Sequence, residues 1–205
     1  MPLNTRDRII ETGAEIIHLK GFNHTGIQEI LTAAGVPKGS FYNYFKSKED
    51  FGLQVIDYFS AHFKRIAKET LEDTSISPLN RIYGFLTAFM DHFESQNYTG
   101  GCPIGNLAQE MGNLSPAFRT KLKESIDMMV DAYSRLLSAA QKDGKISKNL
   151  DIRDTASFIV AGWHGAIIQM KLTNNLKPLK NHRKFIFDYV LYMTIDCYII
   201  YSIWK

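Results

Sequence analysis

The amino-acid sequence predicts an all-α protein. Apolar residues recur at helical spacing along most of the 205 residues, and capping residues, glycines and prolines separate the helical segments. Strand signals are scarce. Hydrophobic residues make up 45% of the chain and charged residues 22%, a composition that suits a folded chain and argues against long disordered stretches. We expect two domains, residues 1–50 and residues 51–205, with no long linker between them.

Capping residues mark the first two helices. Asn4 or Thr5 can cap the first helix, and Gly21 can end it in a left-handed C-cap. The segment Thr25-Gly-Ile-Gln28 reads as a capping box for a short second helix. That helix should end near Ala34, because a glycine, a valine and a proline follow it, and a residue before proline disfavours the helical conformation.

A tight turn joins the second helix to a brief third one. Gly35 lies in this turn, and Pro37 suits the first turn of a helix over roughly residues 38–45, where its missing N–H removes no hydrogen bond. Three short helices, the last two joined by a glycine-containing turn, are the arrangement of a helix-turn-helix. We therefore expect residues 1–50 to form a three-helix, helix-turn-helix domain.

The rest of the chain predicts longer helices with similar punctuation. The expected ranges are 47–73, 78–95, a short piece that ends at 111, 115–143, 151–173 and about 178–204. The stretch 185–204 is rich in Ile, Tyr and Phe but carries Asp188 and Asp196. Each acid would cost about 3 kcal/mol near the centre of a bilayer, so a buried helix is the better interpretation.

Positive charge gathers at one end of the first 50 residues. Six basic and six acidic residues balance in this segment, so the placement of charge is more informative than its amount. The third helix combines small and polar residues that can approach base edges and phosphates in a groove about 12 Å wide. They are Lys38, Gly39, Ser40, Tyr42 and Asn43, with Lys46 and Lys48 beside the next helix and Thr25 at the start of the second.

The four aromatic residues of the third helix allow two interpretations. Phe41 and Phe45 are four residues apart on one helix face, which favours a place in the core. Tyr42 and Tyr44 lie on other faces, and we interpret them as phosphate donors. The alternative is that all four rings are core residues and that the lysines form a solvated rim.

The run Thr25-Gly-Ile-Gln-Glu-Ile-Leu-Thr-Ala-Ala-Gly-Val-Pro-Lys-Gly-Ser-Phe-Tyr-Asn-Tyr-Phe-Lys-Ser-Lys-Glu-Asp50 resembles the DNA-binding signature of the TetR family of bacterial repressors, and the likeness spans residues 5–51. The resemblance implies an all-α subunit of about nine helices, a homodimer and a palindromic double-stranded DNA operator. It also implies that a small molecule or chemical signal at the C-terminal domain releases the DNA. By position, it places Lys38, Gly39, Ser40, Tyr42 and Asn43 in the major groove and Thr25, Tyr44 and Lys48 on phosphates.

The helix expected at 151–173 carries small residues three and four positions apart, which let another helix pack closely. These residues are Ala161, Gly162, Gly165 and Ala166. The TetR resemblance implies a four-helix dimer bundle made from the last two helices of each subunit. We expect this stripe to lie in that interface, and the alternative is an intramolecular core.

A glycine-rich break contains Cys102 at the start of a short helix, where exposed N–H groups can favour the thiolate. The run Gly100-Gly-Cys-Pro-Ile-Gly-Asn-Leu-Ala-Gln-Glu110 resembles a TetR subgroup that includes the NemR and AcuR repressors, which respond to reactive electrophiles or acrylate-type compounds. Pro103 departs from that subgroup, where an aliphatic residue is common. The resemblance also suggests that Lys171 stabilises the thiolate. The alternative is a structural, buried cysteine.

A reversible apolar ligand is the competing signal. Aromatic and methionine side chains between helices can line a cavity, although such residues also build ordinary cores. Trp163 and His164 are the candidate ligand contacts, because each adds a polar group to a bulky ring.

Other functional classes lack supporting motifs. The chain has no nucleophile elbow, HExxH, P-loop or Rossmann glycine pattern, and its six histidines are scattered, so we expect no enzyme, cofactor or metal site. A helical protein-binding adaptor is a rival, but its binding would depend only weakly on salt. Cys102 and Cys197 match no zinc or redox spacing, and the N-terminus lacks a signal-peptide core, which indicates a cytoplasmic protein with no membrane contact.

Overall fold

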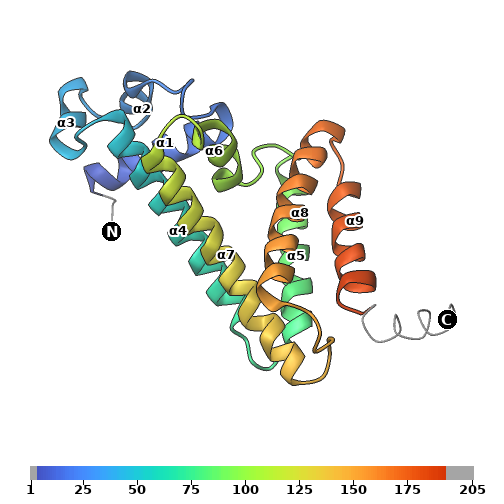
Figure 1. Ribbon diagram of the computed structural model, residues 1–205. Coiled ribbons are helices and arrows are strands. Elements are labelled where there is room, and N and C mark those ends of the chain that lie inside the picture. Colours follow the sequence, from blue (N-terminus) through green and yellow to red (C-terminus); the bar gives the residue numbers. More distant parts are fainter. Residues whose placement is uncertain (1–3, 193–205) are drawn as a thin grey trace, which may run out of the picture. The chain divides into compact units, whose positions relative to one another are not determined.

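The computed structural model describes residues 4–192 and confirms an all-α fold for that range. The described residues form nine α-helices and no strand, and the helices are labelled in Figure 1. The helices are α1 (Thr5–Lys20), α2 (Ile27–Ala33), α3 (Phe41–Tyr44), α4 (Lys48–Leu71), α5 (Pro78–Ser95), α6 (Pro103–Met111), α7 (Pro116–Lys142), α8 (Ile152–Thr173) and α9 (Lys177–Phe185). A 3-10 turn, η1 (Lys38–Ser40), precedes α3, and a π-helical turn, η2 (Ile186–Val190), follows α9.

The chain forms two compact units. The first unit contains the residues up to 65 together with residues 102–126, and the second contains residues 66–101 together with those from 127 on. The long helices α4 and α7 each contribute to both units. The unit that holds the first three helices thus extends beyond residue 50, because α6 and the start of α7 pack with them. A functional boundary at residue 50 stays a prediction.

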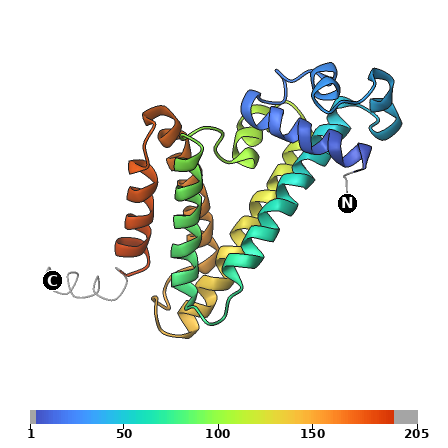
Figure 2. The same cartoon turned by 180° about the vertical axis from the view of Figure 1, so that it is seen from behind.

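In the first unit, α4 and α7 lie side by side in both ribbon views (Figures 1 and 2). The Lys121 ammonium lies 2.7 Å from the Asp57 carboxylate, and the hydroxyls of Ser60 and Ser125 are 2.8 Å apart. In the second unit, α9 packs on α8 and α5 (Figure 2). The cores of both units are apolar, as the helical spacing predicted.

The predicted helix boundaries agree closely with those observed. The Asn4 side chain caps α1 by accepting from the Asp7 N–H at 2.9 Å, and the Asp151 side chain caps α8 in the same way. Gly21 ends α1 with φ +86° and ψ 160°, so the left-handed C-cap predicted there is wrong in ψ. The helix expected to reach about residue 204 begins at Lys177, and its part beyond 192, with Cys197, lies outside the described residues.

None of the helices within residues 4–192 is both long and apolar enough to cross a membrane.

Candidate DNA-binding and effector sites

The turn between α2 and α3 is a Schellman motif. The Gly35 N–H donates to the Thr32 carbonyl at 3.1 Å, and the Val36 N–H donates to the Leu31 carbonyl at 2.9 Å. This closure needs a positive φ at the first residue after the helix cap, and Gly35 has φ +63°. The buried Val36 side chain completes the motif. Backbone hydrogen bonds within residues 31–36 therefore close the turn of the predicted helix-turn-helix.

Two buried aromatic side chains anchor the third helix. Phe41 and Phe45 are 0% and 1% exposed, and their ring centroids lie 5.6 Å and 5.0 Å from that of Phe51 in α4. Aromatic pairs in tilted or edge-to-face arrangement stabilise a core beyond the area that they bury. The core role predicted for Phe41 and Phe45 is confirmed.

The opposite face of η1 and α3 is open to solvent. Tyr42 is 69% exposed and Tyr44 is 40% exposed, so they are not core rings. Lys38, Gly39 and Asn43 are also exposed, Ser40 is half-exposed, and a Cβ added at Gly39 would meet no atom within 4 Å. The residues predicted to face the major groove are therefore accessible to a ligand, and the set Lys38, Gly39, Ser40, Tyr42 and Asn43 is named here the recognition surface.

Thr25 differs from its predicted role. It is 1% exposed, and its hydroxyl donates to the Gly21 carbonyl at 2.7 Å. Gly26 is the N-cap of α2, with no side-chain capping bond, so the predicted capping box is wrong. The hydroxyl closes the α1–α2 turn instead. A phosphate contact from Thr25 requires this turn to rearrange and stays a prediction.

Lys48 is also engaged within the protein. Its ammonium donates to the Phe22 carbonyl at 2.7 Å and lies 4.6 Å from the centre of the Phe22 ring. Loss of hydration lowers the pKa of Lys48, and the nearby Glu110 carboxylate opposes this effect. Glu110 itself accepts from the N–H groups of Phe22 and Asn23. Sequence reasoning missed Glu110, because no local pattern links residues 88 positions apart.

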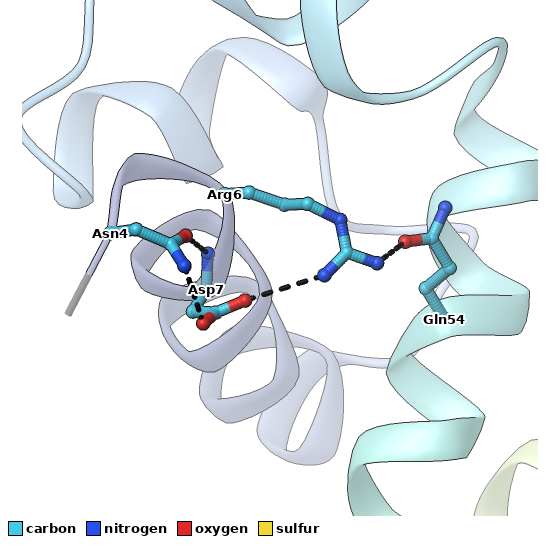
Figure 3. Close-up of polar contacts among 4 residues, drawn as sticks. All are labelled: Asn4, Arg6, Asp7 and Gln54. Carbon is cyan, nitrogen blue, oxygen red and sulfur yellow. Dashed lines mark hydrogen bonds and ion pairs between the residues drawn. The ribbon is translucent and has the colours of Figure 1, made fainter.

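Polar contacts hold the start of α1 against α4 (Figure 3). The Arg6 guanidinium lies 3.3 Å from the Asp7 carboxylate and also donates to the side-chain carbonyl of Gln54. Gln54 in turn donates to Asp50 at 3.2 Å, and Asp50 accepts from the Lys46 N–H at 2.9 Å. This chain of contacts links α1 to the segment that directly follows the recognition surface.

Cys102 is the N-cap residue of α6 and is half-buried. Pro103 occupies the first helical position, and the Asn106 N–H donates to the Cys102 carbonyl at 2.9 Å. The preceding Gly101 has φ +83°, and a Cβ there would lie 2.9 Å from Ile167 and 3.5 Å from the Lys171 side chain. The predicted thiol position at a helix N-terminus is confirmed, whereas its chemistry stays a prediction.

Trp163 and His164 lie in the second unit, on α8. Trp163 is buried and His164 is half-buried, and burial lowers the pKa of His164 below its ordinary value of 6.5. The Trp163 ring lies 5.8 Å from that of His182 on α9. Sequence reasoning counted His182 among scattered histidines. Its Nε2 atom is buried and has no hydrogen-bond partner among the described residues.

Comparison with known proteins assigns the family. The family model described as "Bacterial regulatory proteins, tetR family" matches residues 9–55, and the model described as "Tetracyclin repressor-like, C-terminal domain" matches residues 78–186. The chain belongs to the TetR family. The TetR resemblance drawn from residues 5–51 is thereby confirmed, and a second model covers most of the C-terminal part.

Individual relatives place the chain within the TetR family. It is 35% identical to the HTH-type transcriptional repressor DhaR of Mycobacterium sp. GP1, over 91% of this chain and 92% of DhaR. It is 37% identical to the transcriptional regulator AcuR of Cereibacter sphaeroides, over 83% of this chain and 78% of AcuR. The crystal structure of reduced E. coli NemR matches with TM-score 0.84 at 27% identity, covering 90% of this chain and 95% of NemR. The NemR- and AcuR-like subgroup is supported.

These matches establish the general activity. The chain is a TetR-type DNA-binding transcription regulator, and its relatives are regulators rather than enzymes. TetR regulators bind DNA and dimerise, so a DNA operator and a second copy of the chain are its partners.

The small residues predicted for the TetR dimer interface divide between two roles. A Cβ on Gly162 would lie 2.6 Å from the His182 ring of the same chain, and Ala166 is buried. These two residues serve the intramolecular packing that was the alternative reading. Ala161 is exposed, and a Cβ on Gly165 would meet no atom within 4 Å, so both remain available to a partner subunit.

Proposed function

We propose that this TetR regulator is a cytoplasmic repressor that leaves a palindromic operator when a reactive electrophile modifies Cys102. The observation that carries the proposal is the position of Cys102 at one end of α6, whose other end binds the turn before α2 through Glu110. A modification of Cys102 that displaces the nine-residue helix α6 would therefore also displace the turn of the helix-turn-helix that Glu110 binds. Relatives named repressors, DhaR and NemR, favour repression over activation.

The proposed chemistry is addition of the Cys102 thiolate to an electron-poor double bond. A sulfur–carbon bond forms, the π electrons move to the adjacent carbonyl, and water supplies the proton. The backbone dipoles at the N-terminus of a helix favour a thiolate there, and Cys102 is the N-cap residue of α6. Lys171 stays a proposed effector-sensing residue on the ground of the subgroup resemblance; within the second unit, its side chain lies 3.5 Å from the place of a Cβ on Gly101.

The recognition surface is proposed to read base edges in the major groove, with Tyr44 as a phosphate donor. Lysine and asparagine side chains donate to bases or phosphates, and the small residues Gly39 and Ser40 permit close approach. A symmetric dimer places two such surfaces about 34 Å apart, one DNA turn. Release then requires a change in that spacing.

The proposed dimer contact is an exposed apolar stripe on α8. Its members recur every three or four residues on one face of the helix. Phe158, Ile168 and Leu172 are 59%, 36% and 78% exposed, which is unusual for large apolar residues. The stripe consists of Phe158, Ala161, Gly165, Ile168 and Leu172.

The test is release of the promoter fragment of the protein's own gene, titrated with N-ethylmaleimide. Wild type and Cys197→Ser should release the DNA, whereas Cys102→Ser should hold it. If Cys102→Ser releases the DNA as wild type does, the thiol is structural and the proposal is wrong. If wild type holds its DNA at full alkylation, the proposal is equally wrong.

A reversible apolar ligand is the second candidate signal, and the buried Nε2 atom of His182 favours it. A buried polar atom without a partner has a free-energy cost that a ligand hydrogen bond can remove. Trp163 and His164 on the neighbouring helix are the proposed further contacts. Operator release by a non-electrophilic apolar compound, retained in Cys102→Ser and lost in His182→Phe, would support this candidate.

A further inference from the structure

The turn between α1 and α2 forms a receptor for an anion. The Phe22 N–H donates to Oε2 of Glu110 at 2.8 Å, and the Asn23 N–H donates to Oε1 at 2.7 Å. Both carboxylate oxygens of one α6 side chain are therefore bound by successive backbone N–H groups. Such concave pairs of N–H groups favour negative charge. Gly21 permits the approach, because a Cβ there would lie 2.9 Å from Oε2 of Glu110.

Lys48 holds the other side of the same turn. Its ammonium donates to the Phe22 carbonyl at 2.7 Å and interacts electrostatically with Glu110. The peptide units around Phe22 are thus bound through an N–H by an anion and through a C=O by a cation. Hydrogen bonds that involve a charged group are about twice as strong as neutral ones.

Packing fixes the turn in the same place. The Phe22 ring lies 4.9 Å from that of Phe118 in α7, and a Cβ on Gly52 would lie 2.5 Å from both rings. The Asn23 amide donates to the Met111 sulfur at 3.4 Å. All these residues belong to the first compact unit.

Glu110 supplies the acceptor for the N–H groups of this turn, because the local contacts of Thr25 reach only the Gly21 and Phe22 carbonyls. The N-cap of α2 is Gly26, which offers no side chain, and the Thr25 hydroxyl is directed to Gly21. The α2 helix in turn carries the recognition surface through the Schellman turn at Gly35. We propose that Glu110 is a positioning residue for operator binding, which sets the orientation of the helix-turn-helix through the Phe22 and Asn23 N–H groups.

In this account the Lys48 ammonium binds the Phe22 carbonyl of the turn and does not bind a DNA phosphate. The proposed role of Glu110 rests on operator binding by the helix-turn-helix but does not depend on which signal releases the DNA. The test compares Glu110→Gln with Glu124→Gln, a matched change at an exposed glutamate of α7 in the same unit. Both variants remove one negative charge, so a difference between them reports the specific contacts of Glu110.

We expect Glu110→Gln to weaken binding of the promoter fragment about tenfold, the effect of losing one charge-assisted hydrogen bond. Amide exchange at Phe22 and Asn23, followed by NMR, should accelerate about tenfold. The slope of log affinity against log salt should not change, because Glu110 and Lys48 bind no phosphate in this account. Glu124→Gln should match wild type in all three measurements.

Three outcomes would overturn the proposal. Unchanged amide exchange would show that the carboxylate does not hold the turn, and unchanged DNA affinity with faster exchange would show that the turn does not position the recognition surface. If Lys48→Met lowers the slope of log affinity against log salt by about one in magnitude, Lys48 contacts a DNA phosphate and not the turn.

If Glu110→Gln fails to fold, Glu110→Asp keeps the charge, and it should still accelerate exchange at one of the two amides. Wild type that binds no promoter fragment would instead contradict operator binding itself.

Discussion

The His182 ring occupies the space above Gly162. A Cβ built on Gly162 would lie 2.6 Å from Cε1 and 2.9 Å from Nδ1 of His182, closer than real carbon contacts allow. The two helices α8 and α9 therefore approach each other at a residue with no side chain. The Trp163 ring, 5.8 Å from that of His182, packs at the same contact.

Gly162→Ala should lower the free energy of unfolding by about 1–3 kcal/mol, because the added methyl group displaces the His182 ring. Gly84→Ala is the control, since Gly84 lies within α5 and a Cβ there meets no atom within 4 Å. That variant should be neutral or stabilised by up to about 1 kcal/mol, because alanine favours helix. Urea unfolding measures both, and equal midpoints would refute the close packing.

Lys38→Gln should reduce the salt dependence of operator binding. If the Lys38 ammonium neutralises one phosphate, the slope of log affinity against log salt should fall in magnitude by about 0.9. Lys142→Gln, at an exposed residue of α7 in the second unit, should leave the slope at its wild-type value. Fluorescence anisotropy between low and moderate salt checks this, and identical slopes would remove Lys38 from the phosphate contacts.

Gly165→Leu should weaken the dimer without unfolding the subunit. A Cβ at Gly165 would meet no atom of its own chain within 4 Å, whereas a partner subunit packed on the stripe would meet the added side chain. Gly84→Leu adds the same side chain at an equally open helix position outside the proposed stripe, and should stay dimeric. Sedimentation velocity distinguishes the two. A wild-type dimer in Gly165→Leu would place the interface elsewhere.

Stability should fall as the pH drops below about 6.5. Burial lowers the pKa of His164 and of His182 in the folded state, so the unfolded chain binds protons first. The folded state is then favoured fully above the unfolded pKa and loses that advantage as the pH falls through the folded pKa, by at most about 1.4 kcal/mol per pH unit for one group.

The variant His164→Gln should flatten this pH dependence, whereas His24→Gln, at an exposed histidine, should not. Unfolding midpoints at pH 7.5 and 5.5 measure the effect. An equal loss in His164→Gln and wild type would mean that His164 does not contribute to it.

Local sequence patterns predicted the parts of the fold that local forces determine. Gly35 marked the turn before the third helix, and the structure closes that turn by hydrogen bonds within six residues of the chain. The spacing of Phe41 and Phe45 predicted their burial for the same reason, because both residues lie on one face of one short helix.

Contacts between distant residues were not predictable in this way. Thr25 fits a capping box, but its hydroxyl finds the Gly21 carbonyl, and a carboxylate from α6 binds the turn instead. Likewise, the spacing of small residues predicts that Gly162 lies in the dimer interface, but in the structure the His182 ring of the same chain packs against it. In both cases the missing information was a tertiary neighbour, which leaves no periodic signal in the sequence.

The most direct test of the central claim follows Cys102 modification and operator occupancy in the same sample. Peptide mass spectrometry would give the fraction of Cys102 alkylated by N-ethylmaleimide, separately from Cys197, while anisotropy gives the fraction of promoter fragment bound. The account predicts that DNA release rises in step with Cys102 alkylation and is independent of Cys197. Full alkylation of Cys102 with the operator still bound would contradict it.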